Sequence, residues 1–154
     1  MAHQIQGIIT SFPYTGPLPH LQLLGPYHLI PLDDHTPREE IITPYESLSP
    51  KIRETLKTLS RQGKCAYIET NYFGGLGTQV SEIWENGERI AGPLLSYDGI
   101  ENKMQNPAVS VVAEAINQAL RDMGVQRAAE KDEFDMLGLG RFRSNHSVLK
   151  AIGD

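Results

Sequence analysis

The sequence predicts an α+β domain, in which an antiparallel sheet of about five or six strands carries two main helices packed on one face. Three observations lead to this prediction. Short apolar runs are broken by Pro and Gly, an Asn86-Gly87 pair separates two such runs, and two longer segments have apolar residues at helical spacing. The length of 154 residues fits a single domain over 1–154.

The N-terminal part reads as short strands. Residues 4–11 are rich in isoleucine and predict a first strand. Prolines interrupt the segment that follows, so 21–24 and 27–32 are predicted to be edge strands or loops. A capping box at Thr36–Glu39 then predicts a short helix, which Pro44 ends.

Two longer helices follow from capping signals and apolar spacing. Ser49 as N-cap and Pro50 at the first helical position predict a helix that ends at Gly63. A second helix is predicted over 107–124, and its apolar stripe consists of Val109, Val112, Ala113, Ile116, Leu120 and Met123. Residues 125–154 are predicted to be a C-terminal segment that is either extended or partly ordered.

Between these helices the sequence predicts a three-stranded antiparallel meander over 64–72, 78–85 and 88–95. Asn86-Gly87 is a strong signal for a type I′ turn. A tight turn at this point places Trp84 opposite Arg89, and in the same register Ile83 lies opposite Ile90.

The register across the glycine-rich connection decides whether polar side chains gather. Pairing Tyr72 with Thr78 brings four of them to one face, near the end of the strand pair. They are Glu69, Asn71, Gln79 and Ser81. A polar cluster at the rim of an apolar face is what a ligand pocket requires. The alternative is that these side chains form the solvated half of an ordinary antiparallel pair.

The predicted ligand- or partner-binding residues extend this cluster over the glycines: Glu69, Asn71, Tyr72, Phe73, Gly74, Gly75, Leu76, Gly77, Gln79 and Ser81. Secondary candidates are Arg141 and Arg143, which share a face if the segment is extended and could then bind a carboxylate or phosphate. Their alternative role is to be solvated or to bridge nearby acids. No residue is assigned a catalytic role.

Other chemistry is not indicated. The glycines lead into a strand and no G-x-x-x-x-G-K-[ST] motif is present, which argues against a nucleotide site. Asp33-Asp34-His35 fits the start of a helix better than a metal site. The single cysteine, Cys65, has no activating neighbour in the sequence beyond Lys64. We therefore expect no cofactor and no metal.

Net charge and hydropathy exclude some classes of binding partner. The net charge is −5 and no run of Lys or Arg occurs, which argues against nucleic acid. No apolar run approaches the roughly 20 residues that span a bilayer. The N-terminal residues lack the pattern of a secretory signal, and one cysteine excludes an internal disulfide. These features predict a cytoplasmic protein that does not bind membranes.

One segment resembles known proteins. The stretch Ala66–Gln79, together with Gly7–Thr10 and Tyr27–Leu32, is similar to small stand-alone bacterial proteins of unknown function. Some proteins of this kind resemble immunity partners of bacterial toxins. The resemblance implies a bacterial protein that binds another protein, and it supplies no catalytic residues.

The expected function is therefore a non-catalytic cytoplasmic protein-binding domain, with toxin neutralisation as the role that the resemblance implies. The alternative is a small-molecule-binding protein or an enzyme that uses the polar cluster beside the glycine-rich connection, with Glu69 as acid or base. A protein partner is expected, and homo-oligomerisation remains open.

Overall fold

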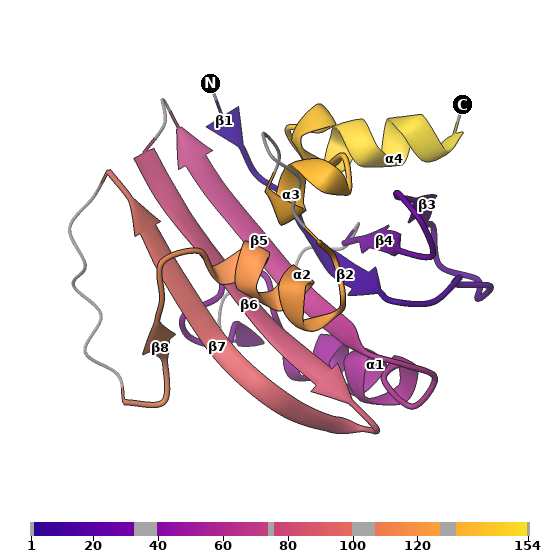
Figure 1. The fold of residues 1–154 in the computed structure, drawn as a ribbon, viewed down its shortest axis with the longest axis horizontal. Helices are drawn as coiled ribbons and strands as arrows, with labels where there is room; N and C mark the ends of the chain where they lie inside the picture. Colours follow the sequence, from indigo (N-terminus) through magenta and orange to yellow (C-terminus); the bar gives the residue numbers. More distant parts are fainter. Residues whose placement is uncertain (1, 33–39, 74–75, 100–106, 127–131, 154) are drawn as a thin grey trace.

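The computed structural model describes residues 2–32, 40–73, 76–99, 107–126 and 132–153. The elements, in chain order, are β1 (Ala2–His3), β2 (Gln6–Thr10), β3 (Leu21–Gln22), β4 (His28–Pro31), α1 (Pro50–Leu59), β5 (Cys65–Phe73), β6 (Leu76–Glu85), β7 (Glu88–Asp98), β8 (Ser110–Val111), α2 (Ala115–Asp122), α3 (Glu133–Met136), the 3₁₀ turn η2 (Leu139–Arg141) and α4 (Asn145–Gly153). Figure 1 shows a curved sheet with helices around it. Within the described residues, no helix has the length and apolar character needed to cross a membrane.

The sheet is open and mostly antiparallel, which confirms the α+β class. Its strands follow the order β3-β4-β2-β5-β6-β7-β8, and β1 pairs with β5 beside β2. The pairing of β7 with β8 is parallel. The described chain thus has more strands than the sequence suggested, because several are only two residues long. The long strands β5, β6 and β7 form the predicted meander at its centre.

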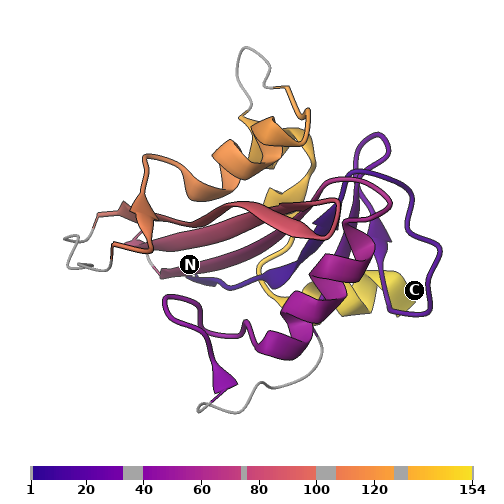
Figure 2. The same ribbon diagram turned by 90° about the horizontal axis from the view of Figure 1, so that it is seen from below.

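The helices cover both faces of this sheet, so the prediction of one shared face is wrong. Figure 2 shows α1 on one side and α2 on the other. On the α1 side the core contains Leu56 and Tyr67, and on the α2 side it contains Ile68 and Leu120. The physical reason lies in β5, whose residues 65–70 are all buried and therefore need cover on both faces.

Helix α1 begins as predicted and is joined to the β6–β7 hairpin at its end. The Ser49 side chain accepts a hydrogen bond from the backbone N–H of Ile52, at 3.3 Å. The helix stops at Leu59, before the predicted Gly63. Ser60 then accepts hydrogen bonds from the backbone N–H groups of Asn86, through its carbonyl oxygen, and of Gly87, through its hydroxyl. These bonds fix the helix against the hairpin turn.

The β6–β7 hairpin has the predicted turn but not the whole predicted register. Asn86 and Gly87 have φ values of 53° and 78°, the two positive angles that a type I′ turn needs. Trp84 lies opposite Arg89 as expected, but Ile83 pairs with Ala91 and not with Ile90. A β-bulge adds a residue to β7 here. As a result Ile90 is about half exposed.

A second register shift occurs between Ser81 and Ile83, opposite Gly92. Gly92 has a φ of 103° and lies so close to Glu82 that an added Cβ would be 2.6 Å from the Glu82 Cβ. A glycine is required because both the backbone angle and the space exclude a side chain. The extra residue lies in β7, so side chains still alternate along β6, and Glu82 shares the α1 face with Val80 and Trp84.

The second predicted helix, over 107–124, is wrong at its start. Residues 110–111 form β8, and α2 begins only at Ala115. The valines in 109–112 are β-branched, and they suit a strand as well as they suit one side of a helix. The helix ends near the predicted Gly124, which has a positive φ of 96°.

Within the described residues of the C-terminal part, 132–153 is mostly helical and packs onto the sheet, so the extended alternative predicted for this part is wrong there. Leu139 and Val148 belong to the core on the α2 side. The side chain of Asn145 accepts a hydrogen bond from the N–H of Gln6, at 2.9 Å, and donates to the carbonyl oxygens of Gln6 and Leu32. Helix α4 is therefore fixed to β2 and to the end of β4.

The remaining expectations concern the N-terminal third. The first strand is confirmed as β2, and β3 lies at the edge of the sheet as expected. β4 is an inner strand, because β3 and β2 flank it. The predicted capping box at Thr36–Glu39 lies outside the described residues.

Candidate functional site

The predicted polar cluster is divided between the two faces of the sheet. Tyr72 pairs with Gly77 and not with Thr78, so the register differs by one residue from the predicted one. Because side chains alternate along a strand, a shift of one residue moves the candidate side chains of one strand to the opposite face of the sheet. Glu69 and Asn71 consequently face α1, whereas Gln79 and Ser81 face α2.

Glu69 and Asn71 hold the segment that precedes α1. The Glu69 carboxylate accepts hydrogen bonds from the backbone N–H groups of Glu46, at 2.7 Å, and Ser47, at 2.9 Å, and from the hydroxyl of Tyr67, at 2.8 Å. Asn71 donates to the Glu46 carboxylate at 2.7 Å. Burial raises the pKa of Glu69, and the three hydrogen bonds only partly oppose it.

Gln79 and Ser81 hold the start of α2. The Gln79 side-chain oxygen accepts from the N–H of Ile116, at 3.1 Å, and the Ser81 hydroxyl donates to the carbonyl oxygen of Ala115, at 2.7 Å. The N-cap residue Glu114 makes no side-chain capping bond. The first N–H groups of a helix have no partner within the helix, and here Gln79 of the sheet supplies one for Ile116.

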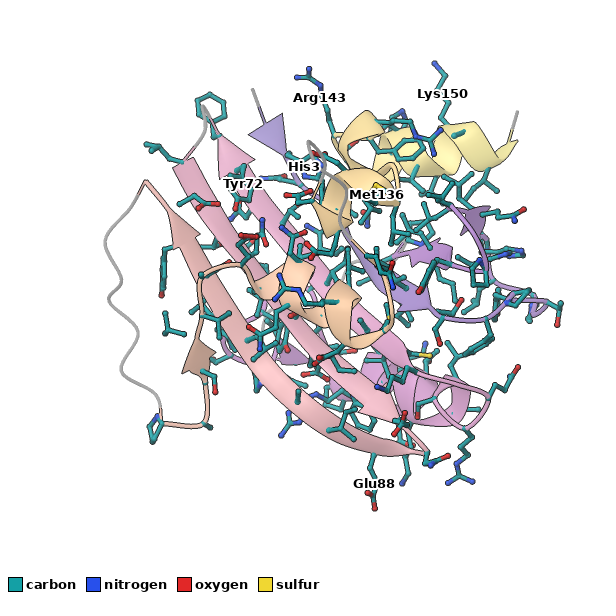
Figure 3. All side chains as sticks on the ribbon, in the orientation of Figure 1. His3, Tyr72, Glu88, Met136, Arg143 and Lys150 are labelled. Carbon is teal, nitrogen blue, oxygen red and sulfur yellow. The ribbon has the colours of Figure 1, made fainter. Side chains whose placement is uncertain are left out.

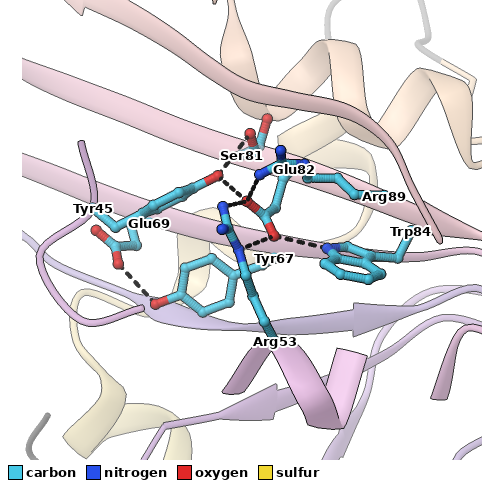
Figure 4. A network of polar contacts seen from close by, with 8 residues as sticks. All are labelled: Tyr45, Arg53, Tyr67, Glu69, Ser81, Glu82, Trp84 and Arg89. Atoms are coloured by element: carbon cyan, nitrogen blue, oxygen red, sulfur yellow. Dashed lines mark hydrogen bonds and ion pairs between the residues drawn. The ribbon is translucent and has the colours of Figure 1, made fainter. Parts of the chain in front are cut away.

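A second buried carboxylate, that of Glu82, organises a network that the sequence did not reveal (Figure 4). It accepts hydrogen bonds from the Tyr45 hydroxyl at 2.7 Å, from the Trp84 indole N–H at 2.7 Å, and from Arg53 through Nε at 3.1 Å and Nη2 at 2.7 Å. The Arg89 guanidinium lies 3.7 Å from the same carboxylate. Four side chains, from the segment before α1, from α1, from β6 and from β7, thus meet at one fully buried carboxylate.

This network gives Glu82 the partners that a buried charge requires. An unpaired carboxylate would be strongly destabilised in the interior, whereas a carboxylate bonded to two cations and two neutral donors is compensated. Burial raises the pKa of Tyr45, and the Glu82 charge raises it further, so the phenol keeps its proton and donates. Tyr45 also packs edge-on against Tyr67, with ring centroids 5.5 Å apart.

A groove of about 500 Å³ lies above the network, between α1 and the turn end of the β6–β7 hairpin. Arg53 and Lys57 of α1 form one wall, and Trp84 and Arg89 of the hairpin form the other. The groove holds three cations, and Glu54 and Glu88 also line it. Glu69 is not among its lining residues.

At the opposite end of β6, the β5–β6 hairpin presents exposed apolar side chains. Phe73 is 78% exposed and pairs across the strands with Leu76, which is 50% exposed. The backbone is close-packed behind them, since a Cβ on Gly77 would collide with the backbone oxygen of Asn71. Gly74 and Gly75 lie outside the described residues.

Tyr72 lies on the other face of this hairpin and donates its hydroxyl to Asp98 of β7. Figure 3 shows Tyr72 beside His3, at the far end of the sheet from Glu88. His3 of β1 pairs with Tyr72. The hairpin end is therefore supported on both sides, by β1 and by β7.

The secondary candidates Arg141 and Arg143 do not lie on an extended segment as predicted. Arg141 belongs to η2, where its Nε donates to the carbonyl oxygen of Gly138 and its guanidinium lies 5.1 Å from the centre of the Phe142 ring. Arg143 follows it, and its carbonyl oxygen accepts from the N–H of Gln4. The two residues thus make separate contacts, Arg141 within its own turn and Arg143 with the segment between β1 and β2.

Cys65 is buried, as the sequence suggested, and burial raises the pKa of its thiol to about 12. Among the described residues, no group of three or more His, Cys, Asp or Glu side chains is placed to hold a metal ion. Asp33, Asp34 and His35 lie outside those residues.

Sequence reasoning missed Tyr45, Arg53 and Glu82. Val80, Glu82 and Trp84 alternate along β6, so an acidic residue between two apolar ones was a signal for a buried charge. No signal showed that Arg53 would reach it from α1, because that contact depends on which face the helix covers.

Comparison with known proteins gives no family or relative. No protein-family model, no curated protein and no solved structure matches this chain. The resemblance to small bacterial proteins stays a prediction, and the function has to be argued from the geometry described above.

Proposed function

We propose that this chain is a non-catalytic protein-binding domain that contacts its partner with the end of the β5–β6 hairpin. The observation that supports this function is the exposure of Phe73, at 78%, directly beside the half-exposed Leu76. A few buried aromatic anchors supply most of the binding energy in many protein interfaces. Phe73 and Leu76 form a compact anchor of this type.

The hairpin end is suited to this role because both of its strands are held by contacts behind the two apolar side chains. The close approach at Gly77 and the contact from Tyr72 to Asp98 hold the strands behind the two apolar side chains. An anchor that is already ordered loses less conformational entropy on binding.

Charge indicates the chemistry of the partner. Between Lys64 and Lys103 the chain has one basic residue, Arg89, which lies at the other end of the hairpins. The exposed acidic residues Glu46 and Asp98 belong to the segments that contact the hairpin end. We therefore propose a partner with an apolar pocket bordered by basic side chains.

The resemblance adds a bacterial toxin as the partner class and bacterial immunity as the process. The single cysteine, buried in the core, fits a reducing compartment, and we place the binding in the cytoplasm.

The enzymatic alternative receives less support from the geometry. It requires Glu69 and Asn71 to act with Gln79 and Ser81, but these pairs face opposite sides of the sheet. The Glu69 side chain is also engaged by three donors of its own chain. The same contacts suit a residue that fixes the 45–47 segment.

The test is capture of a partner by tagged protein from a lysate of the source organism, compared between variants. Phe73→Ala and Leu76→Ala should each weaken capture, by about 30-fold for a loss of about 2 kcal/mol at an anchor residue. Leu24→Ala is the matched control, because Leu24 is an exposed leucine, at 58%, in the β3–β4 region of the sheet. Thermal unfolding of each variant shows whether the fold is retained.

Capture that depends on Phe73, is unaffected by Leu24→Ala and weakens as salt rises supports the proposal. Equal capture by the wild type and both hairpin variants contradicts it. If size-exclusion chromatography shows a dimer that Phe73→Ala dissociates, the surface joins two copies of this chain and the proposal of a basic partner is wrong.

A further inference from the structure

The groove between α1 and the β6–β7 hairpin lies far from the proposed partner-binding end. Trp84 and Leu76 are separated by eight residues along β6, which is about 26 Å in an extended strand. The volume of about 500 Å³ is in the range of small-molecule sites. Any ligand of this groove is therefore independent of the contact made by Phe73.

The charges beneath the groove are not balanced within the network. Two guanidiniums, those of Arg53 and Arg89, approach Glu82 Oε1 at 2.7 and 3.7 Å. Glu82 carries one negative charge, so it neutralises one of them. Its other oxygen is occupied by the Trp84 indole N–H and by Arg53 Nε.

The acidic residues of the groove do not supply the missing charge. Glu54 and Glu88 line it, but within the described residues neither forms an ion pair with Arg53, Lys57 or Arg89. Both are exposed to solvent, where a charge is screened, and Arg89 at the rim is exposed as well. The side chain of Arg53, by contrast, is only 23% exposed, so its charge is partly removed from water.

Two guanidiniums held close together form a binding surface for oxyanions. Arginine has a planar fork of N–H donors that matches a carboxylate or phosphate. Glu82 holds the fork of Arg53 with two hydrogen bonds, and the Arg89 guanidinium lies 3.7 Å from the same carboxylate. Arg53 uses only Nε and Nη2 on Glu82. The ring of Trp84 and the side chain of Ile42 add apolar surface to the same groove.

We propose that this groove binds a small organic anion, with its carboxylate or phosphate on Arg53 and Arg89 and its apolar body against Trp84. Glu82 is the positioning residue of the site. It holds the Arg53 guanidinium in place through two hydrogen bonds, and it also competes with the ligand for the charge of Arg53 and Arg89.

Trp84 makes the proposal directly testable, because it is the one tryptophan of the chain. Its indole N–H gives a single resonance in a ¹⁵N-correlated NMR spectrum, and this N–H donates to Glu82 at the floor of the site. Benzoate and inorganic phosphate are the probes, titrated at constant ionic strength. Benzyl alcohol, which has the ring without the charge, is the control ligand.

The expected result is a saturable shift of the Trp84 resonance with an anion, at about millimolar concentration for such small ligands. Benzyl alcohol should cause no comparable shift. Saturation by benzoate alone assigns an aromatic carboxylate, and saturation by phosphate alone assigns a phosphorylated ligand.

Variants separate binding from structure. Arg89→Gln should weaken binding at least about tenfold, because it removes one of the two guanidiniums that contact the anion. Arg89 lies at the rim and is partly exposed, so the substitution should leave the fold intact. Arg141→Gln makes the same change of charge in the C-terminal segment, and it should leave the affinity unchanged. Glu82→Gln should bind the anion more tightly than the wild type, because the competing charge is removed and the side-chain shape is kept.

If Glu82→Gln does not fold, Arg89→Lys serves as the second variant, and it should bind more weakly than the wild type but more tightly than Arg89→Gln. The proposal is wrong if neither anion gives a saturable shift, if benzyl alcohol gives the same shift, or if Arg89→Gln binds like the wild type. Phe73→Ala should bind the anion normally, so this test and the partner test fail separately.

Discussion

Removal of one hydroxyl group tests how much the Glu82 network stabilises the fold. Tyr45 is 4% exposed, and its hydroxyl donates to Glu82 at 2.7 Å. Tyr45→Phe deletes this donor and keeps the ring, including its edge-on contact with Tyr67. The change therefore removes the hydrogen bond to a buried charge, together with the longer contact, at 3.3 Å, from the same hydroxyl to the carbonyl oxygen of Ser81.

The size of the effect follows from the contacts that remain. A hydrogen bond to a charged group contributes about 1.5–3 kcal/mol. Glu82 retains Arg53 and Trp84 as donors, so we expect a loss near the middle of this range, about 2 kcal/mol. With an unfolding entropy of about 2.1 cal/mol/K per residue, a chain of 154 residues has about 0.3 kcal/mol/K, and Tm falls by about 6 °C.

Urea unfolding followed by circular dichroism measures the free energy, and calorimetry measures Tm. Tyr97→Phe is the matched control, because within the described residues the Tyr97 hydroxyl has no hydrogen-bond partner, and its loss should change stability by less than about 0.5 kcal/mol. A Tyr45→Phe variant as stable as Tyr97→Phe would show that the network contributes nothing measurable through this bond.

Two further predictions concern buried groups that titrate. Burial raises the pKa of Glu69 above its ordinary value of 4.5, so the folded state favours the neutral form of this side chain. The contribution of the neutral form to stability is fully present below pH 4.5, and it is lost as the pH rises through the pKa of the folded state. The unfolding free energy of the wild type minus that of Glu69→Gln should therefore decrease from pH 4 to pH 7, and an increase measured by urea unfolding would contradict the raised pKa. For Cys65, a pKa of about 12 leaves roughly one thiol in ten thousand ionised at pH 8, so iodoacetamide should label it only in denaturant. Rapid labelling of the native protein, followed by mass spectrometry, would show that the thiol is accessible and activated.

The sequence predicted those elements whose signals are local. The Asn86-Gly87 turn, the start of α1 at Ser49 and the meander all depend on a few adjacent residues, and the structure confirms them. Turn and capping residues act through their own backbone angles and hydrogen bonds, so neighbouring elements change them little.

The elements that failed depend on contacts between distant residues. The pairing of Tyr72 with Gly77 is set by how the hairpin closes, and a shift of one residue divided the predicted polar cluster. One of the two bulges of β7 arises where Gly92 lies against Glu82, and no short sequence pattern marks that approach. The burial of 65–70 on both faces also depends on distant partners, because Glu69 and Thr70 are polar and are buried against other segments of the chain.

The candidate sites show the same division. Phe73 and Leu76 were selected from the sequence as neighbours of the glycines, and the structure shows both as exposed. Glu82 escaped notice because its importance comes from Arg53 and Arg89, which belong to other elements. A buried charge can be suspected from alternation, but its partners require the fold.

The contact between Asn145 and Gln6 has a consequence for the order in which the chain can fold. It joins positions 139 residues apart, and the bond to Leu32 joins positions 113 apart. During synthesis the N-terminal strands leave the ribosome long before residue 145 does. Until then the backbone groups of Gln6 and Leu32 that Asn145 contacts remain hydrogen-bonded to water. Such long-range contacts slow folding. We therefore expect β2 and β4 to become protected from hydrogen exchange only after the meander has formed.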